Sequence, residues 1–214
     1  MPDSVRFIDS FAFSECKSLE TIRLSENLVS LDQYAFLGCS SLKSIKLPNK
    51  LRSIENSTFK ECSSLKEVII PNGVTKIGED AFKRCESLEK LVIPDSVTSI
   101  GKAFCYGCKK LREIRIPEGI KSIENDAFYN CSSLENVSLP NSVTSIGNNA
   151  FYSCKSLPSI NIPGCIIRIG KNAFSDCDVL FDIFFGGTEA DWKKIGLRQS
   201  WYESKPRYIV HFNK

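Results

Sequence analysis

A fixed spacing of 23 residues is the feature of this 214-residue sequence that most constrains its fold. Eight cysteines follow the spacing: Cys16, Cys39, Cys62, Cys85, Cys108, Cys131, Cys154 and Cys177. Eight leucines follow it three positions later: Leu19, Leu42, Leu65, Leu88, Leu111, Leu134, Leu157 and Leu180. A period of roughly 20–50 residues is typical of architectures in which each unit stacks on its neighbours. The spacing therefore predicts one continuous solenoid of about eight 23-residue repeats rather than separate domains.

The segment between Cys85 and Cys108 shows what the first half of a repeat contains. Leu91 and Ile93 alternate with their neighbours, which is the period of a short strand with one buried face. Pro94 follows and is expected to end the strand, because proline has no N–H to donate to a neighbouring strand.

The second half of the repeat carries a second extended segment and an aromatic pair. Val97 and Ile100 are expected to point inward, and Gly101 permits a bend after them. An Ala-Phe pair then recurs at residues 12–13, 35–36, 81–82, 127–128, 150–151 and 173–174. Each Phe is expected to fill the widest part of the core. Inward residues about three apart between this pair and the next Leu predict a single helical turn.

Composition and charge exclude several classes of protein. With 42% hydrophobic and 25% charged residues the chain can bury a core and is not disordered. The net charge of +3 is spread over interspersed residues of both signs, so a nucleic-acid partner is not expected. No apolar run approaches the roughly 18 residues of a membrane span, so membrane insertion is not expected. Residues 1–5 lack the basic and apolar regions of a signal peptide.

The repeat consensus, Leu-x-x-Ile-x-Leu-Pro-x-x-Val-x-x-Ile-Gly-x-x-Ala-Phe-x-x-Cys, resembles the leucine-rich repeat of the BspA-like (Treponema-type) class over roughly residues 2–185. The resemblance implies a right-handed α/β repeat solenoid, a horseshoe or superhelix. Parallel strands would line its concave face and the Ala-Phe-Cys segment its outer wall. It also implies an adhesin-like binding role at the cell surface or in secreted form, with a protein or glycan ligand, including extracellular molecules of a host.

The two ends of the chain lead to different expectations. Residues 1–185 form the predicted solenoid and residues 186–214 a predicted C-terminal cap. In the cap, Thr188 lies three residues before Asp191 and predicts a helix start, and Trp192 is expected to plug the open core. Residues 208–212 alternate and predict a closing strand. The first residues enter in mid-repeat without a polar cap. We therefore expect either missing upstream sequence or a homo-oligomer formed through the uncapped N-terminal end.

The repeat cysteines could in principle form disulfides. We predict instead eight reduced, shielded thiols, because stacked side chains that point the same way keep their Cβ atoms too far apart to bridge. In one repeat the Ala-Phe pair comes a residue early, which puts Cys105 in the Phe column and creates a Cys-x-x-Cys with Cys108. Such a pair can indicate redox chemistry or half of a zinc site. The alternative that we favour is that the outer wall slides locally so that Phe104 still fills its slot.

No catalytic constellation is present in the sequence. It contains no phosphate-binding glycine loop, no zinc-protease motif and no Gly-x-Ser-x-Gly. The only histidine, His211, lies in the predicted terminal strand, where a structural role is expected. We therefore expect no enzyme, no cofactor and no metal site.

The outward positions of the predicted strands supply the candidate binding site. In a parallel stack, equivalent positions align, so Ile69 and Val92 would form an apolar centre on the concave sheet face. An apolar centre with a charged rim is typical of a protein-binding patch. The candidate residues are Lys46, Glu67, Ile69, Lys90, Val92, Glu113 and Arg115. Two alternatives stay open: that the exposed apolar residues merely suit a strand, and that the chain is a structural spacer that self-assembles through its N-terminal coil.

Overall fold

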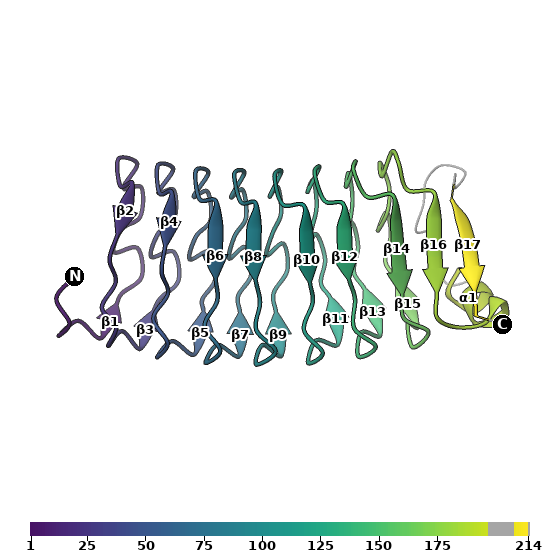
Figure 1. The fold of residues 1–214 in the computed structure, drawn as a ribbon, viewed down its shortest axis with the longest axis horizontal. Coiled ribbons are helices and arrows are strands. Elements are labelled where there is room, and N and C mark those ends of the chain that lie inside the picture. Colours follow the sequence, from purple (N-terminus) through teal and green to yellow (C-terminus); the bar gives the residue numbers. More distant parts are fainter. Residues whose placement is uncertain (197–207, 214) are drawn as a thin grey trace.

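The structure, a computed structural model, describes residues 1–196 and 208–213. The chain winds into a stack of about eight coils, and the N-terminus and the C-terminal cap lie at opposite ends (Figure 1). Strand partners are 23 residues apart; for example, Ile69 pairs with Val92. The predicted leucine-rich-repeat solenoid and its period are therefore confirmed. The described repeats contain strands and turns, and helix occurs only in the cap.

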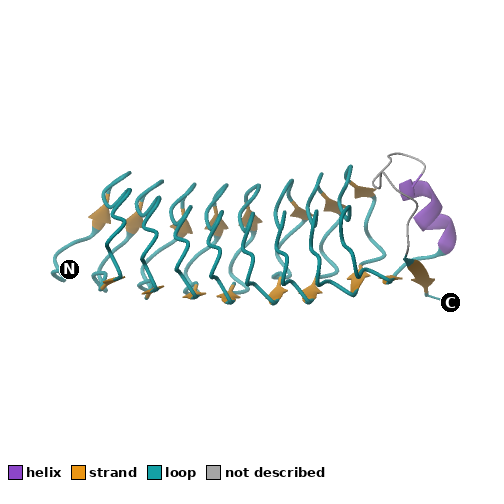
Figure 2. Cartoon of the chain, turned by 90° about the horizontal axis from the view of Figure 1, so that it is seen from above, coloured by secondary structure: helices purple, strands orange, loops and turns teal. Residues whose placement is uncertain are grey.

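Two rows of parallel strands run along the stack, as Figure 2 shows from above. The first row, here called the long-strand face, comprises β2 (Thr21–Ile22), β4 (Ser44–Ile45), β6 (Glu67–Ile69), β8 (Lys90–Val92), β10 (Glu113–Arg115), β12 (Asn136–Ser138), β14 (Ser159–Ile162), β16 (Asp182–Phe185) and β17 (Ile209–Phe212). The second row, the short-strand face, is the predicted second extended segment. It comprises β1 (Phe7–Ile8), β3 (Ser30–Leu31), β5 (Ser53–Ile54), β7 (Lys76–Ile77), β9 (Ser99–Ile100), β11 (Ser122–Ile123), β13 (Ser145–Ile146) and β15 (Arg168–Ile169).

The core is a set of aligned columns. Rings of the Phe column stack nearly parallel, as in Phe59 and Phe82, whose centroids lie 5.5 Å apart with 9° between the ring planes. Six of the eight repeat cysteines are buried, and a typical one, Cys85, donates its thiol to the Phe59 carbonyl oxygen at 3.1 Å. All ten cysteines are free. The prediction of eight shielded thiols is wrong at the two end coils, where Cys16 is exposed and Cys177 half-buried, because only one neighbour covers them.

The outer wall is not the predicted helical turn. Its N–H groups divide between two directions: Cys85 donates to the Phe82 carbonyl within the coil at 3.1 Å, whereas Phe82 donates to the Phe104 carbonyl of the next coil at 2.7 Å. Left-handed residues make this alternation possible, with φ of 56° at Asp80 and 59° at Arg84. The wall is therefore a chain of turns that is itself hydrogen-bonded from coil to coil.

The predicted slide of the wall at residues 102–108 is also wrong. Cys105 donates to the Ala127 carbonyl at 3.1 Å, as a Phe-column residue does elsewhere, and Ala103 keeps the left-handed conformation of its column. Phe104 therefore stands at an Ala position. Its ring is still buried, as expected, but it meets Phe128 edge-on, with 5.2 Å between centroids and 77° between planes. The backbone hydrogen bonds hold the register, so the side chain turns instead.

Each sheet is interrupted where the sequence leaves the repeat pattern. The long-strand face is split between β12 and β14, where Pro158 has no N–H for the preceding coil. The short-strand face is split between β3 and β5, where Glu55 replaces the usual glycine. Where glycine is present, the coils stack closely: a Cβ on Gly78 would lie 2.6 Å from the Asn56 nitrogen.

A single boundary splits both faces. It separates β8 from β10 and β9 from β11, and Figure 1 shows β8 and β10 set farther apart than β10 and β12. At this boundary Glu124 replaces the glycine, and the crosswise ring of Phe104 lies between the coils. Ile100 is only half-buried here, whereas its counterparts Ile77 and Ile123 are buried. We refer to this as the split boundary.

The cap begins as predicted. The helix α1 (Glu189–Gly196) follows Thr188, whose hydroxyl oxygen accepts from the Asp191 N–H at 3.3 Å. Trp192 lies against Phe185, with 5.1 Å between ring centroids, but it is only half-buried, and Ile195 is the helix residue that reaches the core. The predicted closing strand is β17, which pairs with β16. Residues 197–207 and 214 of the predicted cap lie outside the described part of the chain.

Candidate functional site

The seven predicted site residues are all exposed and lie on or directly after β4, β6, β8 and β10 of the long-strand face. Four of them line one hollow of about 310 Å³ between β8 and β10: Lys90, Val92, Glu113 and Arg115. The buried side chains of Leu91, Ile93 and Ile114 line it as well. The remaining three, Lys46, Glu67 and Ile69, lie outside it on the N-terminal side.

The hollow exists because hydrogen bonds that join other coils are missing at the split boundary. Between the preceding pair of coils, Glu89 donates to the Lys66 carbonyl at 2.8 Å and Ile70 to the Val92 carbonyl at 3.1 Å. Among the described residues, no corresponding bond joins Arg112 to Glu89 or Ile93 to Arg115. The two strands part at this place, so the hollow extends down to the apolar side chains beneath them, which stay only 4–5% exposed.

An apolar strip borders the hollow on its N-terminal side. Ile69 and Val92 are paired neighbours on β6 and β8, and 57% and 40% of their respective surfaces are exposed. This confirms the predicted alignment of the two side chains. Hydrophobic surface of this kind next to an accessible hollow gives a partner a place to bury apolar atoms.

The charges around the strip are held in exposed ion pairs. Lys46 contacts Glu26 at 2.7 Å and Arg115 contacts Asp95 at 2.7 Å. The pair with Asp95 raises the pKa of Arg115, and the pair with Lys46 lowers the pKa of Glu26. Both cations of the predicted rim are therefore balanced by carboxylates from the turns beside the strands.

The central charges, Glu67, Lys90 and Glu113, lie on the three strands β6, β8 and β10. Lys90 forms its ion pair with Glu67 at 2.8 Å, and this contact raises the pKa of Lys90. Glu113, across the split boundary, takes part in none of the ion pairs of the described residues. Its charge nevertheless adds to the rise in the pKa of Lys90.

The described residues hold no side-chain cluster placed to bind a metal ion at this surface. No group of three or more His, Cys, Asp or Glu side chains is placed to hold a metal ion in residues 1–196 and 208–213. Cys105 and Cys108 of the Cys-x-x-Cys are both fully buried, and burial raises the pKa of Cys105. No described helix has the length and apolar character needed to cross a membrane.

Parallel coils with a 23-residue period and an exposed sheet surface define a leucine-rich repeat protein, whose repeats serve as a protein-interaction module and are typically non-catalytic. The chain belongs to the BspA-type family: the model described as "BspA type Leucine rich repeat region (6 copies)" matches residues 1–111 and 98–196.

Solved bacterial structures share the fold. A leucine-rich repeat protein from Bacteroides ovatus is 31% identical over 86% of this chain, with a TM-score of 0.68. A leucine rich cell surface protein from Faecalibacterium prausnitzii is 36% identical over 74% of this chain, with a TM-score of 0.66. The aligned regions cover 53% and 43% of those two chains, so this chain spans about half of their length. No curated protein sequence matches the chain.

Sequence reasoning missed part of the hollow. Asn136 and Ser138 of β12 line it, together with the buried side chains of Leu91, Ile93 and Ile114. A signal was available: the displaced Phe104 and the replacement of glycine by Glu124 both mark the boundary where the coils part.

Proposed function

We propose that the long-strand face binds a partner protein and that the hollow between β8 and β10 anchors it. The observation that carries this proposal is the hollow at the split boundary, which borders the exposed apolar strip of Ile69 and Val92. Binding energy in protein interfaces is concentrated in such central apolar pockets, with polar residues around them.

The ion pairs around the hollow can be replaced by ion pairs to the charged groups of a partner. Pairs between exposed side chains contribute only about 0–1 kcal/mol each, so a partner's charges can replace them at little cost. The unpaired carboxylate of Glu113 favours a partner that brings a Lys or Arg to the C-terminal side of the hollow. A hollow of about 310 Å³ can receive one or two side chains rather than a folded element.

The setting of this binding is also a proposal. We place the protein at the cell surface or in secreted form and its partner among the extracellular proteins of a host. The description of the relative from Faecalibacterium prausnitzii as a cell surface protein supports this placement.

The test compares two double variants at different places on the surface, each of which changes one Lys to Glu and one exposed aliphatic residue to Asp. Lys90→Glu with Val92→Asp changes the long-strand face, and Lys76→Glu with Ile167→Asp changes exposed residues elsewhere on the solenoid. Binding to a panel of purified vertebrate matrix and serum proteins is measured by surface plasmon resonance. We expect the first variant to weaken binding at least ten-fold and the second to leave it unchanged, with both melting as the wild type does. Equal binding by both variants, or binding to immobilised oligosaccharides alone, would contradict the proposal.

A second candidate role is assembly through the first coil. Phe7 and Phe11 are exposed by 62% and 54% at that end of the stack. If this surface receives another copy, the apparent mass in light scattering should rise with concentration, and Phe7→Glu with Phe11→Glu should abolish the rise. A constant monomer mass at all concentrations would contradict this role.

A further inference from the structure

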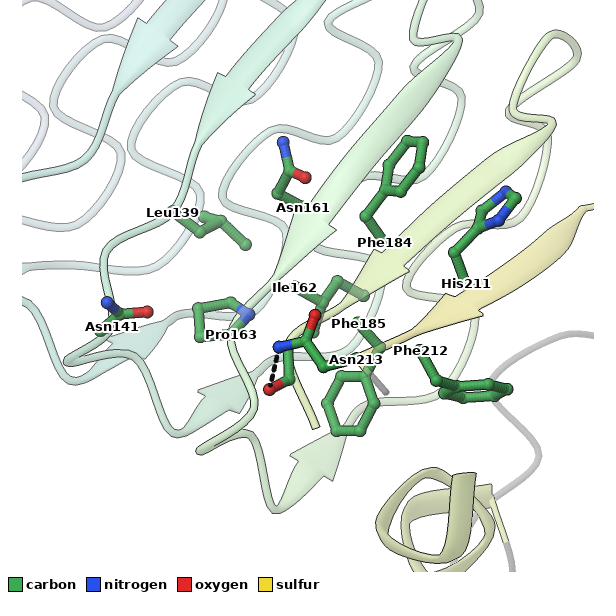
Figure 3. Close-up of a pocket in the computed structure, with 11 residues that line it drawn as sticks. Leu139, Asn141, Asn161, Ile162, Pro163, Phe184, Phe185, His211, Phe212 and Asn213 are labelled. Carbon is green, nitrogen blue, oxygen red and sulfur yellow. Dashed lines mark hydrogen bonds between the residues drawn. The ribbon is translucent and has the colours of Figure 1, made fainter. Parts of the chain in front are cut away.

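A second hollow, of about 280 Å³, lies at the C-terminal end of the long-strand face, where the ends of β12, β14, β16 and β17 meet (Figure 3). It shares no residue with the hollow between β8 and β10: Asn136 and Ser138 of β12 line that hollow, whereas Leu139 and Asn141, which follow β12, line this one. We propose that it is a binding subsite for one ring of a neutral carbohydrate, separate from the protein-binding surface.

An aromatic platform stands in this hollow. Phe184 is 43% exposed, and one face of its ring stacks on His211 with 4.7 Å between centroids and 17° between planes. His211 is itself held by Asp182, whose Oδ1 lies 2.7 Å from its Nε2. The neighbour of Phe184 on the other side is its strand partner Asn161, which is too small to cover the ring. One ring face is thus fixed by packing, and the opposite face is left to a ligand, which suits the apolar C–H face of a sugar.

Two side-chain amides are free to bind hydroxyl groups. Asn161 and Asn141 are exposed and line the hollow, and neither side chain makes a hydrogen bond within the described residues. A primary amide offers both donors and an acceptor, which matches the paired hydroxyls of a sugar ring. Figure 3 shows Asn161 beside Phe184 and Asn141 at the far rim. On the third side, Asn213 donates to the Gly186 carbonyl at 3.0 Å and closes the wall.

The floor is apolar because the sheet is split at Pro158. Leu139 is only half-buried, whereas Ile116 and Ile162 at the same position of neighbouring coils are buried. Leu139 and Pro163 thus present carbon atoms at the base of the hollow (Figure 3). The lining includes no Lys, Arg, Asp or Glu, and its one titratable side chain, His211, is engaged by Asp182, so the lining favours a neutral ligand. Ligand pockets for drug-sized molecules begin at about 300 Å³, so the size fits a single ring.

The test uses the methyl glycosides of glucose, galactose, mannose and N-acetylglucosamine, with saturation-transfer NMR to detect contact and calorimetry to measure Kd. We expect at least one of them to bind in the millimolar range and to bind equally well in 0.5 M salt, since the ligand is neutral. Phe184→Ala should weaken binding at least ten-fold. Phe181→Ala is the matched control, because Phe181 is also exposed, by 54%, but does not line the hollow. Asn161→Ala should weaken binding several-fold and keeps the test decisive if Phe184→Ala does not fold.

Several outcomes would overturn the proposal: no saturation transfer with any of the four glycosides, equal binding by Phe184→Ala and the wild type, or an equal loss in Phe181→Ala. Stronger binding of methyl glucuronide than of all four neutral glycosides would overturn it too. The variant that combines Lys90→Glu with Val92→Asp should leave sugar binding unchanged, so this inference and the proposed protein interface can fail independently.

Discussion

The split boundary can be tested by restoring the repeat pattern at two positions. Phe104→Ala together with Cys105→Phe moves the ring back into the Phe column, where Phe82 and Phe128 already stand in register. The backbone need not move, because it already holds the regular register there. We expect the new ring to stack nearly parallel on its neighbours and β8 to approach β10.

The size of the effect follows from the bonds that reform. Two backbone bonds outside the strands join the preceding coils, from Glu89 and Ile70, and their equivalents from Arg112 and Ile93 are missing at the split boundary. At about 1 kcal/mol net for each bond, the two restored bonds would add roughly 2 kcal/mol. For a chain of this size that corresponds to a rise of about 4–8 °C in Tm. Phe104→Ala alone should instead cost about 3–5 kcal/mol, because it removes a buried ring.

Hydrogen exchange measures the change where it occurs. In the wild type, the amides of Arg112 and Ile93 should exchange faster than those of Glu135 and Ile116, which donate to neighbouring coils at 2.7 and 3.0 Å. The double variant should slow the first two to the rate of the others. It should also weaken partner binding, because the hollow closes.

Unchanged exchange at Arg112 and Ile93, with Tm equal to or below that of the wild type, would refute the reasoning. In that case the crosswise ring would not be the cause of the parting. The replacement of glycine by Glu124 would then be the remaining explanation, and Glu124→Gly would be the variant to examine.

Three further predictions concern the interior and the cap. Burial raises the pKa of interior thiols such as Cys85, so at pH 8 they should stay protonated. Mass spectrometry after iodoacetamide treatment of the native protein should therefore find label mainly on the two exposed cysteines, Cys16 and Cys165. Rapid labelling of the interior cysteines would contradict this. Gly101→Ala should lower the free energy of unfolding by about 1–3 kcal/mol, because the added Cβ would lie 2.5 Å from a backbone nitrogen of the preceding coil. An unchanged midpoint in chemical unfolding would disprove the close approach. The salt bridge to Lys194, with the Thr188 hydrogen bonds, lowers the pKa of Asp191 from 3.8 to about 2, so its stabilisation of the α1 N-terminus is complete above pH 4 and is lost as the pH falls through about 2. The protection of the α1 amides, measured relative to intrinsic exchange at each pH, should fall over this range in the wild type, and constant protection or an equal fall in Asp191→Asn would count against it.

Much of the fold could be predicted because the period is encoded redundantly. Cys, Leu, Phe and Pro recur at fixed offsets, and each indicates the same stacking. The outer wall could not be predicted in the same way. The i→i−3 spacing of inward residues is shared by a helical turn and by the alternating turns observed. Only the hydrogen bonds between coils, such as that from Phe82 to Phe104, decide between them.

The candidate site could be predicted in part. Alternation placed Ile69 and Val92 on the outer side of neighbouring strands, and the pairing confirms it. The hollow depends on where the ladder fails, which is a consequence of side-chain packing in three dimensions. The early Ala-Phe pair signalled an irregularity, but whether the backbone slides or the Phe104 ring turns depends on the relative cost of breaking wall hydrogen bonds and of reorienting one side chain.

At the split boundary the outer wall stays hydrogen-bonded, through Cys105 to Ala127 and Gly107 to Tyr129, while both sheets part. The solenoid therefore has two segments, one on each side of the split boundary, that stay hydrogen-bonded along the outer wall. Bending about this wall would widen or narrow the gap between β8 and β10. A molecule bound in that gap would fix the angle between the two segments, and tension on the ends of the chain would in turn change the affinity for that molecule.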